Sequence, residues 1–200
     1  MLTEGISGHL VLVMAPTGSG KGTLIAYAES MFPQIKRLIS CTTREMRPGE
    51  KEGVNYHFIS REKFQSKIEQ GEFVEWAEFS GNLYGTLKSD IGACLRNSQV
   101  VINEIDVQGV IQLQSLVPRD NYTIVYIDAG NWETLKARAL ARAPISEEQL
   151  TLRHQRYLEE ETFKHLADFI IQNNDDQFEE AKVKMHTIME NIIKKVESNT

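Results

Sequence analysis

The chain has 200 residues, of which 41% are hydrophobic and 25% charged, and its formal net charge is -6. These values are typical of one compact α/β domain with small insertions. The acidic balance excludes a broad basic face for duplex nucleic acid, although it allows a local basic pocket for one nucleotide. No run of residues approaches the roughly 18 apolar positions of a membrane span, so we expect no membrane partner.

The cysteine content gives an expectation about the compartment. Cys41 and Cys94 lie far apart in the sequence, which predicts neither a disulfide framework nor a metal cluster. The first residues lack the basic segment and apolar run of a secretory leader. We therefore expect free thiols in a reducing cytoplasm. The sequence leaves the oligomeric state open between monomer and homodimer.

Apolar strand patterns alternate with helical patterns along the chain. Residues 10–14 form a short apolar run typical of a buried parallel strand, and a glycine-rich turn and a helix at 24–32 follow. Further strands are predicted at 100–105, 122–127 and 169–171, and further helices at 107–116 and 178–196. This alternation predicts an α/β fold with a parallel sheet covered by helices.

Two segments interrupt the alternation. Residues 41–90 are rich in glycines, aromatic residues and charges, and they predict an inserted subdomain with a hairpin turn at Gly81-Asn82. Residues 138–155 carry arginines and Pro144 between two helical stretches, which predicts a mobile lid. The core is then divided into residues 9–40, 91–137 and 156–197.

The turn after the first strand has the features of a phosphate-binding loop. The usual pattern is Gly, four residues, Gly-Lys and then Ser or Thr, and here Ala15 and Gly22 depart from it. Gly18 and Gly20 still allow backbone N–H groups to converge on an anion, and Lys21 adds a positive charge. The helix that follows presents its positive end to the same anion. The predicted loop comprises Ala15, Pro16, Thr17, Gly18, Ser19, Gly20, Lys21, Gly22 and Thr23.

Gly22 removes the hydroxyl that usually binds magnesium directly at this position. Because Mg²⁺ readily keeps several water ligands, we expect it to be held through water, with the Thr23 hydroxyl nearby.

A second anion site is predicted downstream, where residues 42–50 read TTREMRPGE. Arg44 and Arg47 are three apart, and Tyr56 follows closely. Guanidinium groups bind phosphate oxygens bidentately and a phenol adds one hydrogen bond, so these residues predict a clamp for one phosphate. Taken alone, the arginines are equally compatible with a solvated loop.

The motifs together resemble those of guanylate kinases. The chain reads APTGSGKGT, TTREMRPGE, GVNYHF, GEFVEWAEFSGNLYGT and NEIDVQG in that family's order and at similar spacing, over about residues 9–175. The GKGT ending of the loop is more similar to that of adenylate kinases, which belong to the same broad group. The resemblance implies a P-loop NTPase-type core with an inserted GMP-binding subdomain and a lid, and ATP on the phosphate loop.

The resemblance also implies the residues of the GMP site. These are Ser40, Arg44, Arg47, Tyr56, Glu75, Tyr84 and Thr86, with Asp106 close by. The chemistry of Glu75 agrees with this role, because one carboxylate accepts both the N1–H and the exocyclic amino group of guanine. Adenine presents an acceptor at N1 and would be rejected. A solvated acid at a strand edge is the alternative interpretation of Glu75.

The resemblance further implies that lid arginines reach over ATP and the transferred group. The expected catalytic residues are Lys21, Arg44, Arg138, Arg142 and Arg153, acting together with Mg²⁺. Asn173 is expected to touch ATP. Glu104 stands where the family has an aspartate, and it is expected to contact magnesium through water.

The expected reaction is transfer of the γ-phosphoryl group of ATP to GMP, and to dGMP, giving ADP and the nucleoside diphosphate. The attacking phosphate oxygen is already anionic, so positioning and charge neutralisation replace a general base. Two alternatives remain at this point, namely a kinase of the same fold with another acceptor, and a non-catalytic guanylate-kinase-like module that binds protein partners.

Overall fold

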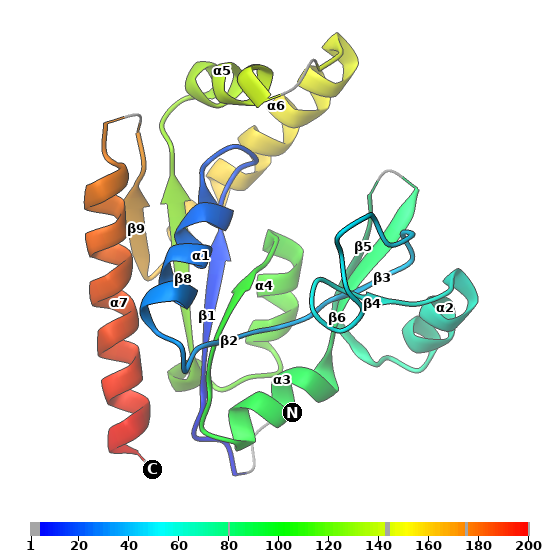
Figure 1. The fold of residues 1–200 in the computed structure, drawn as a ribbon, viewed down its shortest axis with the longest axis vertical. Coiled ribbons are helices and arrows are strands. Elements are labelled where there is room, and N and C mark those ends of the chain that lie inside the picture. The colour runs from blue at the N-terminus through cyan, green and yellow to red at the C-terminus, as the bar shows by residue number, and fades with distance from the viewer. Residues whose placement is uncertain (1–4, 80, 143–144, 175, 200) are drawn as a thin grey trace.

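The computed structural model describes residues 5–79, 81–142, 145–174 and 176–199. Its centre is a five-stranded sheet in the order β2-β7-β1-β8-β9, and every neighbouring pair in it is parallel. The strands are β1 (His9–Met14), β2 (Lys36–Arg37), β7 (Val100–Glu104), β8 (Tyr122–Asp128) and β9 (Phe169–Gln172). Figure 1 shows β1 in the middle of this sheet.

Helices cover both faces of the sheet, as the alternating pattern predicts. They are α1 (Lys21–Met31) and α7 (Phe178–Ser198) on one face, and α3 (Lys88–Arg96) and α4 (Val107–Gln114) on the other. Because side chains alternate along a strand, Val11 and Val13 of β1 pack toward the first pair while Leu10 and Leu12 pack toward the second. All four residues are at most 1% exposed, which explains the continuous apolar run of this strand.

The predicted core elements are confirmed, with shifted ends, while strand β2 and helix α3 of the core were not predicted. The first helix begins at Lys21 and not at residue 24, because Gly20 takes the N-cap position and the glycine-rich segment already turns into helix there. The fifth strand, β2, was not predicted. Its two residues, Lys36 and Arg37, are exposed and charged, so they carry no apolar signal.

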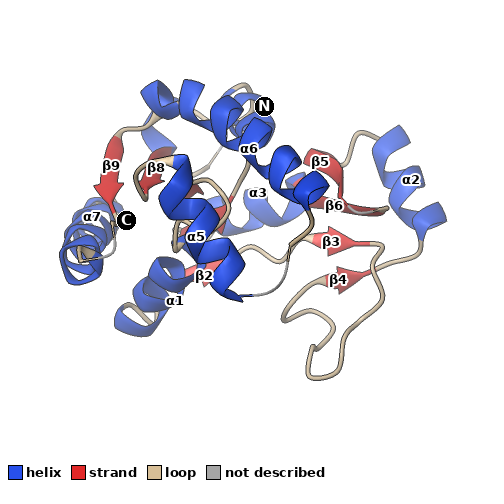
Figure 2. Ribbon diagram, turned by 90° about the horizontal axis from the view of Figure 1, so that it is seen from above, coloured by secondary structure: helices blue, strands red, loops and turns tan. Residues whose placement is uncertain are grey.

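The segment after β2 forms a second sheet in the order β4-β3-β6-β5, which lies to one side of the main sheet (Figure 2). Its elements are β3 (Cys41–Thr42), β4 (His57–Phe58), β5 (Phe73–Phe79), β6 (Asn82–Leu87) and the helix α2 (Arg61–Glu69). β5 and β6 pair antiparallel, as the predicted turn at Gly81 requires. A separate small core of Cys41, Phe64, Phe73 and Leu83 holds this unit together. Both cysteines of the chain are free thiols.

Two helices lie beyond the carboxyl ends of the central strands (Figure 1). They are α5 (Trp132–Arg142) and α6 (Glu147–Thr162), and the Trp132 ring stacks on His154 with centroids 4.7 Å apart. Ser146 caps α6 by accepting a hydrogen bond from the Gln149 backbone N–H. Two short 3₁₀ turns, Arg119–Asn121 and Lys164–Leu166, complete the described elements. Among the described residues, no helix is long and apolar enough to cross a bilayer.

Candidate active site

The phosphate loop joins the end of β1 to the start of α1. Gly18 and Gly20 adopt φ values of 94° and 87°, a left-handed conformation that side chains disfavour. The first turn of α1 holds no acidic residue, so its positive end stays available for an anion. Ser19 Oγ is buried and has no hydrogen-bond partner among the described residues. Since buried polar groups are normally paired, this loop has the character of a ligand site.

Lys21 and Glu104 lie together at the carboxyl edge of the sheet. Val13 of β1 pairs with Glu104 of β7, which brings the end of β7 beside the phosphate loop. Lys21 Nζ lies 3.1 Å from Glu104 Oε1 and also donates a hydrogen bond to the Ala15 carbonyl at 3.3 Å. The structure therefore brings the predicted phosphate lysine and the predicted metal-site carboxylate into direct contact.

Asn173 supports the phosphate loop from behind. Its side-chain amide donates to the Ser19 carbonyl at 2.6 Å, and the residue is only 4% exposed. A Cβ at Gly20 would lie 2.5 Å from the same amide nitrogen, so the loop and Asn173 are in close contact. Arg138 donates to the Asn173 carbonyl at 3.0 Å, which ties α5 to the end of β9. The side chains of Asn173 and Arg138, which were both expected to reach ATP, thus bind backbone carbonyls in this structure. Their contacts with ATP stay predictions.

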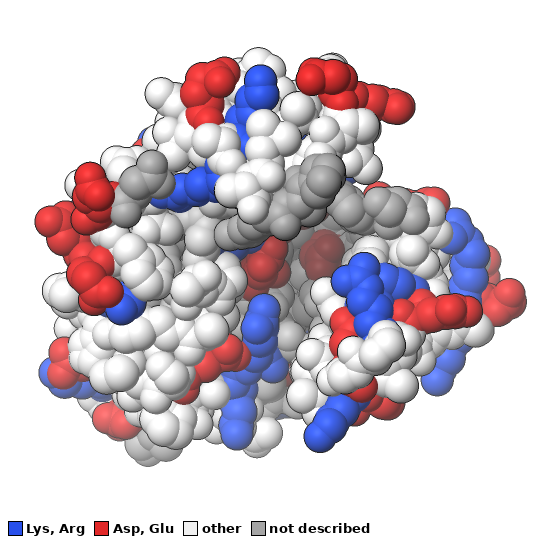
Figure 3. All heavy atoms as spheres, turned by 45° about the horizontal axis from the view of Figure 1, so that its top comes forward, with Lys and Arg blue, Asp and Glu red and all other residues white. Residues whose placement is uncertain are grey.

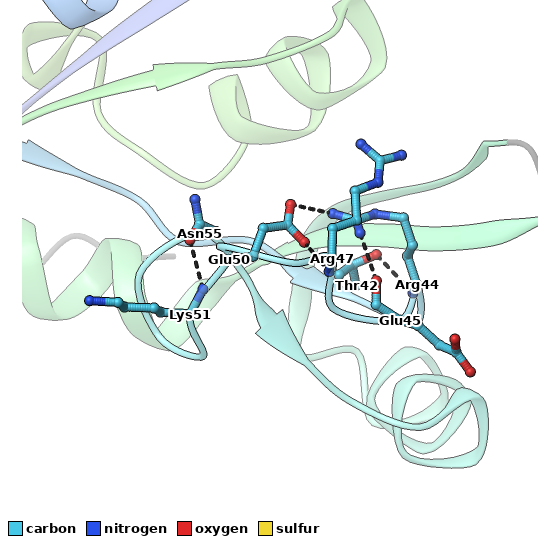
Figure 4. Close-up of polar contacts among 7 residues, drawn as sticks. All are labelled: Thr42, Arg44, Glu45, Arg47, Glu50, Lys51 and Asn55. Carbon is cyan, nitrogen blue, oxygen red and sulfur yellow. Dashed lines mark hydrogen bonds and ion pairs between the residues drawn. The ribbon is translucent and has the colours of Figure 1, made fainter.

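The arginine loop between β3 and β4 is held by one carboxylate, that of Glu50 (Figure 4). Glu50 accepts from the Arg44 guanidinium at 2.7 Å and from the Arg47 backbone N–H at 2.8 Å. The guanidinium of Arg47 points away from Glu50 and from the Arg44 guanidinium (Figure 4). The hydrogen bond from Arg44 is the main cause that lowers the pKa of the Glu50 carboxyl, and Glu50 in turn raises the pKa of Arg44.

Two tyrosines complete the predicted phosphate clamp. The rings of Tyr56 and Tyr84 meet edge to face with centroids 5.8 Å apart. The Arg44 guanidinium carbon lies 5.6 Å from the Tyr56 ring centroid and 5.7 Å from that of Phe58. Burial raises the pKa of Tyr56, so its hydroxyl remains a hydrogen-bond donor at neutral pH. The structure therefore brings Arg44, Tyr56 and Tyr84 together as the motifs predict.

The predicted guanine-reading residues form a short chain of hydrogen bonds. Glu75 on β5 faces Thr86 on β6, whose hydroxyl donates to the Glu75 carboxylate at 2.7 Å. The Ser40 hydroxyl lies 3.3 Å from that of Thr86. Burial raises the pKa of Glu75, the Thr86 hydrogen bond opposes this, and the charge of Asp106 adds to the rise. The arrangement leaves a partly buried carboxylate that can accept a pair of donors.

Asp106 has a structural role beside this acid. Its carboxylate accepts from the Gly109 backbone N–H at 2.7 Å and caps the start of α4. A Cβ at Gly109 would lie 2.8 Å from Glu75 Cγ, so only glycine lets α4 approach β5 this closely. Residues 104–109 thus link the two candidate sites, because Glu104 at one end pairs with Lys21 and Gly109 at the other lies close beside the Glu75 side chain.

The sites lie on a hollowed face of the molecule. Figure 3 shows a hollow between the two halves of this face, with acidic and basic side chains deep inside it. Mixed charges inside a recess suit a ligand that carries both phosphate oxygens and hydrogen-bond donors.

Known proteins match the chain over nearly its whole length. The family model described as guanylate kinase matches residues 7–192. The guanylate kinase of Rubrobacter xylanophilus is 37% identical over 93% of this chain and 95% of its own. That of Fusobacterium nucleatum is 37% identical over 94% of this chain and 98% of its own.

The chain belongs to the guanylate kinase family. A solved relative supports this at the level of structure, since the guanylate kinase from Anaplasma phagocytophilum matches with a TM-score of 0.67 at 25% identity. The match covers 94% of this chain and 86% of that one. The α/β fold with its mostly parallel sheet is thereby confirmed.

The predicted lid of this guanylate kinase family member, residues 138–155, stays a prediction and is described only in part. Arg153 lies on α6 and is partly exposed. Arg142 ends α5, but its side chain lies outside the described residues, as does Pro144. The predicted catalytic roles of Arg138, Arg142 and Arg153 therefore stay predictions.

Gly22, which departs from the phosphate-loop pattern, has open space around it. A Cβ at Gly22 would meet nothing within 4 Å, so packing does not enforce the missing hydroxyl. Thr23 is exposed one residue further into α1. Thr23 offers a hydroxyl and Glu104 a carboxylate, and their role in holding Mg²⁺ through water stays a prediction.

The motifs missed two residues that belong to this guanylate kinase site. One is Glu50, whose contacts appear only in three dimensions. The other is Glu160 of α6, which enters a crevice lined by Ala15, Asp106 and Tyr126. Burial, the largest cause, raises the pKa of Glu160 to about 7. The sequence does not single out Glu160, because it is the middle one of three consecutive glutamates.

Proposed function

We propose that the enzyme transfers the γ-phosphoryl group of ATP to GMP, and to dGMP, with ATP on the phosphate loop and the acceptor in the Glu75 subdomain. The observation that carries this proposal is the link through residues 104–109, which joins Lys21 on one side to Glu75 on the other. This link supports a geometry in which two nucleotides meet end to end over the carboxyl ends of β1 and β7.

The acceptor's base is selected by the acid on β5. Ionised Glu75 accepts two donors, N1–H and the exocyclic amino group, which guanine offers side by side. Thr86 already donates to one carboxylate oxygen and so fixes the orientation of the group. An acceptor at the N1 position of adenine would face the carboxylate unpaired, which costs about 10⁴-fold or more in comparable hydrogen-bonding sites.

The acceptor's phosphate is held by the clamp on the other side of the subdomain. Arg44 and Arg47 supply planar donors, and the hydroxyls of Tyr56 and Tyr84 add single hydrogen bonds. Because the phosphate oxygen is the nucleophile and is already anionic, no side chain has to remove a proton. Catalysis then consists of holding two mutually repelling anions in line and spreading positive charge over the transferred group.

The lysine at the start of α1 must change partners for this chemistry. In the free protein its Nζ pairs with Glu104, whose side chain is 47% exposed. Bound ATP offers Lys21 a stronger anion, which frees the Glu104 carboxylate. Thr23 and Glu104 would then hold Mg²⁺ through water, and the ion would neutralise charge between the phosphates. Lid arginines 138, 142 and 153 would add charge from above and exclude water.

The experiment that tests this proposal is a coupled assay of ADP formation with GMP, dGMP, AMP, CMP and UMP at equal concentration. We expect rapid turnover with GMP, slower turnover with dGMP, and rates with the other three lower by at least about two orders of magnitude. Comparable rates with AMP would assign the site to another acceptor. No turnover with any nucleotide would assign the chain to a binding module.

The cytoplasmic location and the monomer-or-homodimer alternative stay predictions from the sequence.

A further inference from the structure

The carboxylate of Glu50 joins the two halves of the arginine loop. One oxygen accepts from the Arg44 guanidinium at 2.7 Å, and the other accepts from the Arg47 backbone N–H at 2.8 Å (Figure 4). The side chains of Arg44 and Glu50 are only 13% and 18% exposed, so this pair is far less solvated than a surface ion pair. The carboxylate therefore fixes both the guanidinium and the turn that carries the second arginine.

The guanidinium of Arg44 is held from several sides but keeps donors in reserve. One terminal nitrogen donates to Glu50 and the other to the Glu45 carbonyl at 2.6 Å. The rings of Tyr56 and Phe58 flank the group. A guanidinium carries five N–H donors, so these two bonds and a further hydrogen bond with the Tyr84 side chain still leave donors for an incoming anion. The arginine is thus already ordered in the free protein and still able to bind phosphate.

Two effects of Glu50 oppose each other when a phosphate arrives. Its negative charge repels the phosphate, which would weaken binding. Its hydrogen bond removes the rotamer freedom of a long side chain before binding, which strengthens binding. The two effects predict opposite results when the charge is removed, so they can be told apart.

We propose that Glu50 is a positioning residue that preorganises Arg44 for the phosphate of the acceptor nucleotide. The second oxygen of Glu50 extends the same control to the loop, because it holds the Arg47 backbone in the turn. This inference rests on the proposed function in one respect, namely that Arg44 binds the acceptor's phosphate.

The first test is the variant Glu50→Gln, which keeps an oxygen for the Arg47 N–H but loses the charge that holds Arg44. We expect the KM for GMP to rise about tenfold, with kcat reduced less than about threefold and the KM for ATP within about twofold. An unchanged or lower KM for GMP would overturn the inference, because repulsion would then outweigh positioning.

A matched control lies in the same loop. The Asn55 side chain accepts from the Lys51 backbone N–H at 2.9 Å and has no bond to either arginine (Figure 4). Asn55→Ala removes a loop hydrogen bond that involves no side chain of the clamp, so the KM for GMP should stay within about twofold of wild type. A rise equal to that of Glu50→Gln would show that loop folding alone sets the effect, and would overturn the inference.

A double-mutant cycle separates this inference from the function on which it rests. Calorimetric titration with GMP gives the dissociation constant of the wild type, Glu50→Gln, Arg44→Ala and the double variant. We expect Glu50→Gln to weaken binding only where Arg44 is present. An equal loss in both backgrounds would overturn the positioning role of Glu50. Unchanged affinity in Arg44→Ala would instead remove Arg44 from the acceptor site, and with it the inference.

Discussion

At the scale of single residues, the central feature is a carboxylate whose ionisation the site has to maintain. Glu75 is partly buried, and burial raises its pKa, while the Thr86 hydroxyl stabilises the ionised form. This balance explains why a threonine stands opposite the acid. In the proposed guanine site, a protonated acid would present an O–H donor where guanine also has a donor, so one of the two expected hydrogen bonds would be lost.

Replacing Glu75 with glutamine should reduce the preference for GMP over AMP and leave the fold intact. The amide has one acceptor oxygen and presents donors where guanine also has donors, so kcat/KM for GMP should fall about 100-fold or more. Steady-state kinetics with GMP and AMP measure this. Glu78→Gln is the matched control, because Glu78 lies on the same strand and pairs with Arg61 at 3.2 Å on the surface. Equal losses in both variants would contradict the role of Glu75.

The carboxyl of Glu160 predicts a pH-dependent stability. Burial is the main cause that raises its pKa to about 7, and the charges of Asp106 and Glu104 add to the rise. Lys21 and Arg156 oppose it. Because the folded pKa lies above the unfolded one, folding favours the protonated form. This contribution is fully present below about pH 4.5 and is lost as pH rises through about 7.

Glu160→Gln should therefore stabilise the protein more at pH 8 than at pH 5. The gain at pH 8 is at most about 3 kcal/mol, which corresponds to at most about 6–12 °C in Tm for a domain of this size. Thermal unfolding at the two pH values measures it. Glu159→Gln, at an exposed neighbouring position, should show no such difference between pH values. A gain that does not depend on pH would refute the assignment.

At the scale of elements, the start of α1 depends on a close contact with β9. Gly20 has a φ of 87°, and a Cβ there would lie 2.5 Å from the Asn173 amide nitrogen. Gly22, two residues later in the same turn, has a helical backbone and open space around it. Substitution by alanine should therefore change the free energy of unfolding in opposite directions at Gly20 and Gly22.

Gly20→Ala should lower the free energy of unfolding by about 2 kcal/mol or more, through left-handed strain and the clash with Asn173. Gly22→Ala should raise it by up to about 1 kcal/mol, because alanine favours helix. Denaturant unfolding of the two variants makes the comparison. Similar stabilities would contradict the loop geometry described above.

Some of these strands and helices could be predicted from the sequence, and others could not. Strands β1, β7 and β8 are predictable because buried parallel strands read as apolar runs. β2 is not, since its exposed Lys36 and Arg37 pair with β7 only through backbone atoms. Helices α2 and α3 were also missed. α2 buries only Phe64, so its sequence shows little apolar periodicity.

For the site, the resemblance to guanylate kinases implied a set of residues but not what they contact. Ser40, Thr86 and Glu75 form one hydrogen-bonded chain, which the sequence did not predict. Asn173 instead uses its amide on the phosphate loop, a partner 154 residues away that no local pattern reveals. Glu50 was read as part of a motif without a role, because its role depends on how the loop folds back on itself.

At the scale of the whole molecule, the proposed function joins a donor site on the parallel sheet to an acceptor site on the small second sheet. Residues 104–109 are the shared boundary, with Glu104 against Lys21 and Gly109 against Glu75. Helices α5 and α6, the predicted lid, lie over the carboxyl ends of the same strands (Figure 1). Closure of the lid and of the second sheet over two bound nucleotides would exclude water from the transfer.

The most direct test of this arrangement is a crystal structure with GMP and a non-hydrolysable ATP analogue bound together. We expect the guanine edge on Glu75, the acceptor phosphate on Arg44, and the γ-phosphate on the loop around Lys21, in line and about 3–3.5 Å from the acceptor oxygen. GMP bound away from Glu75, or phosphates too far apart for transfer with the lid closed, would contradict the account.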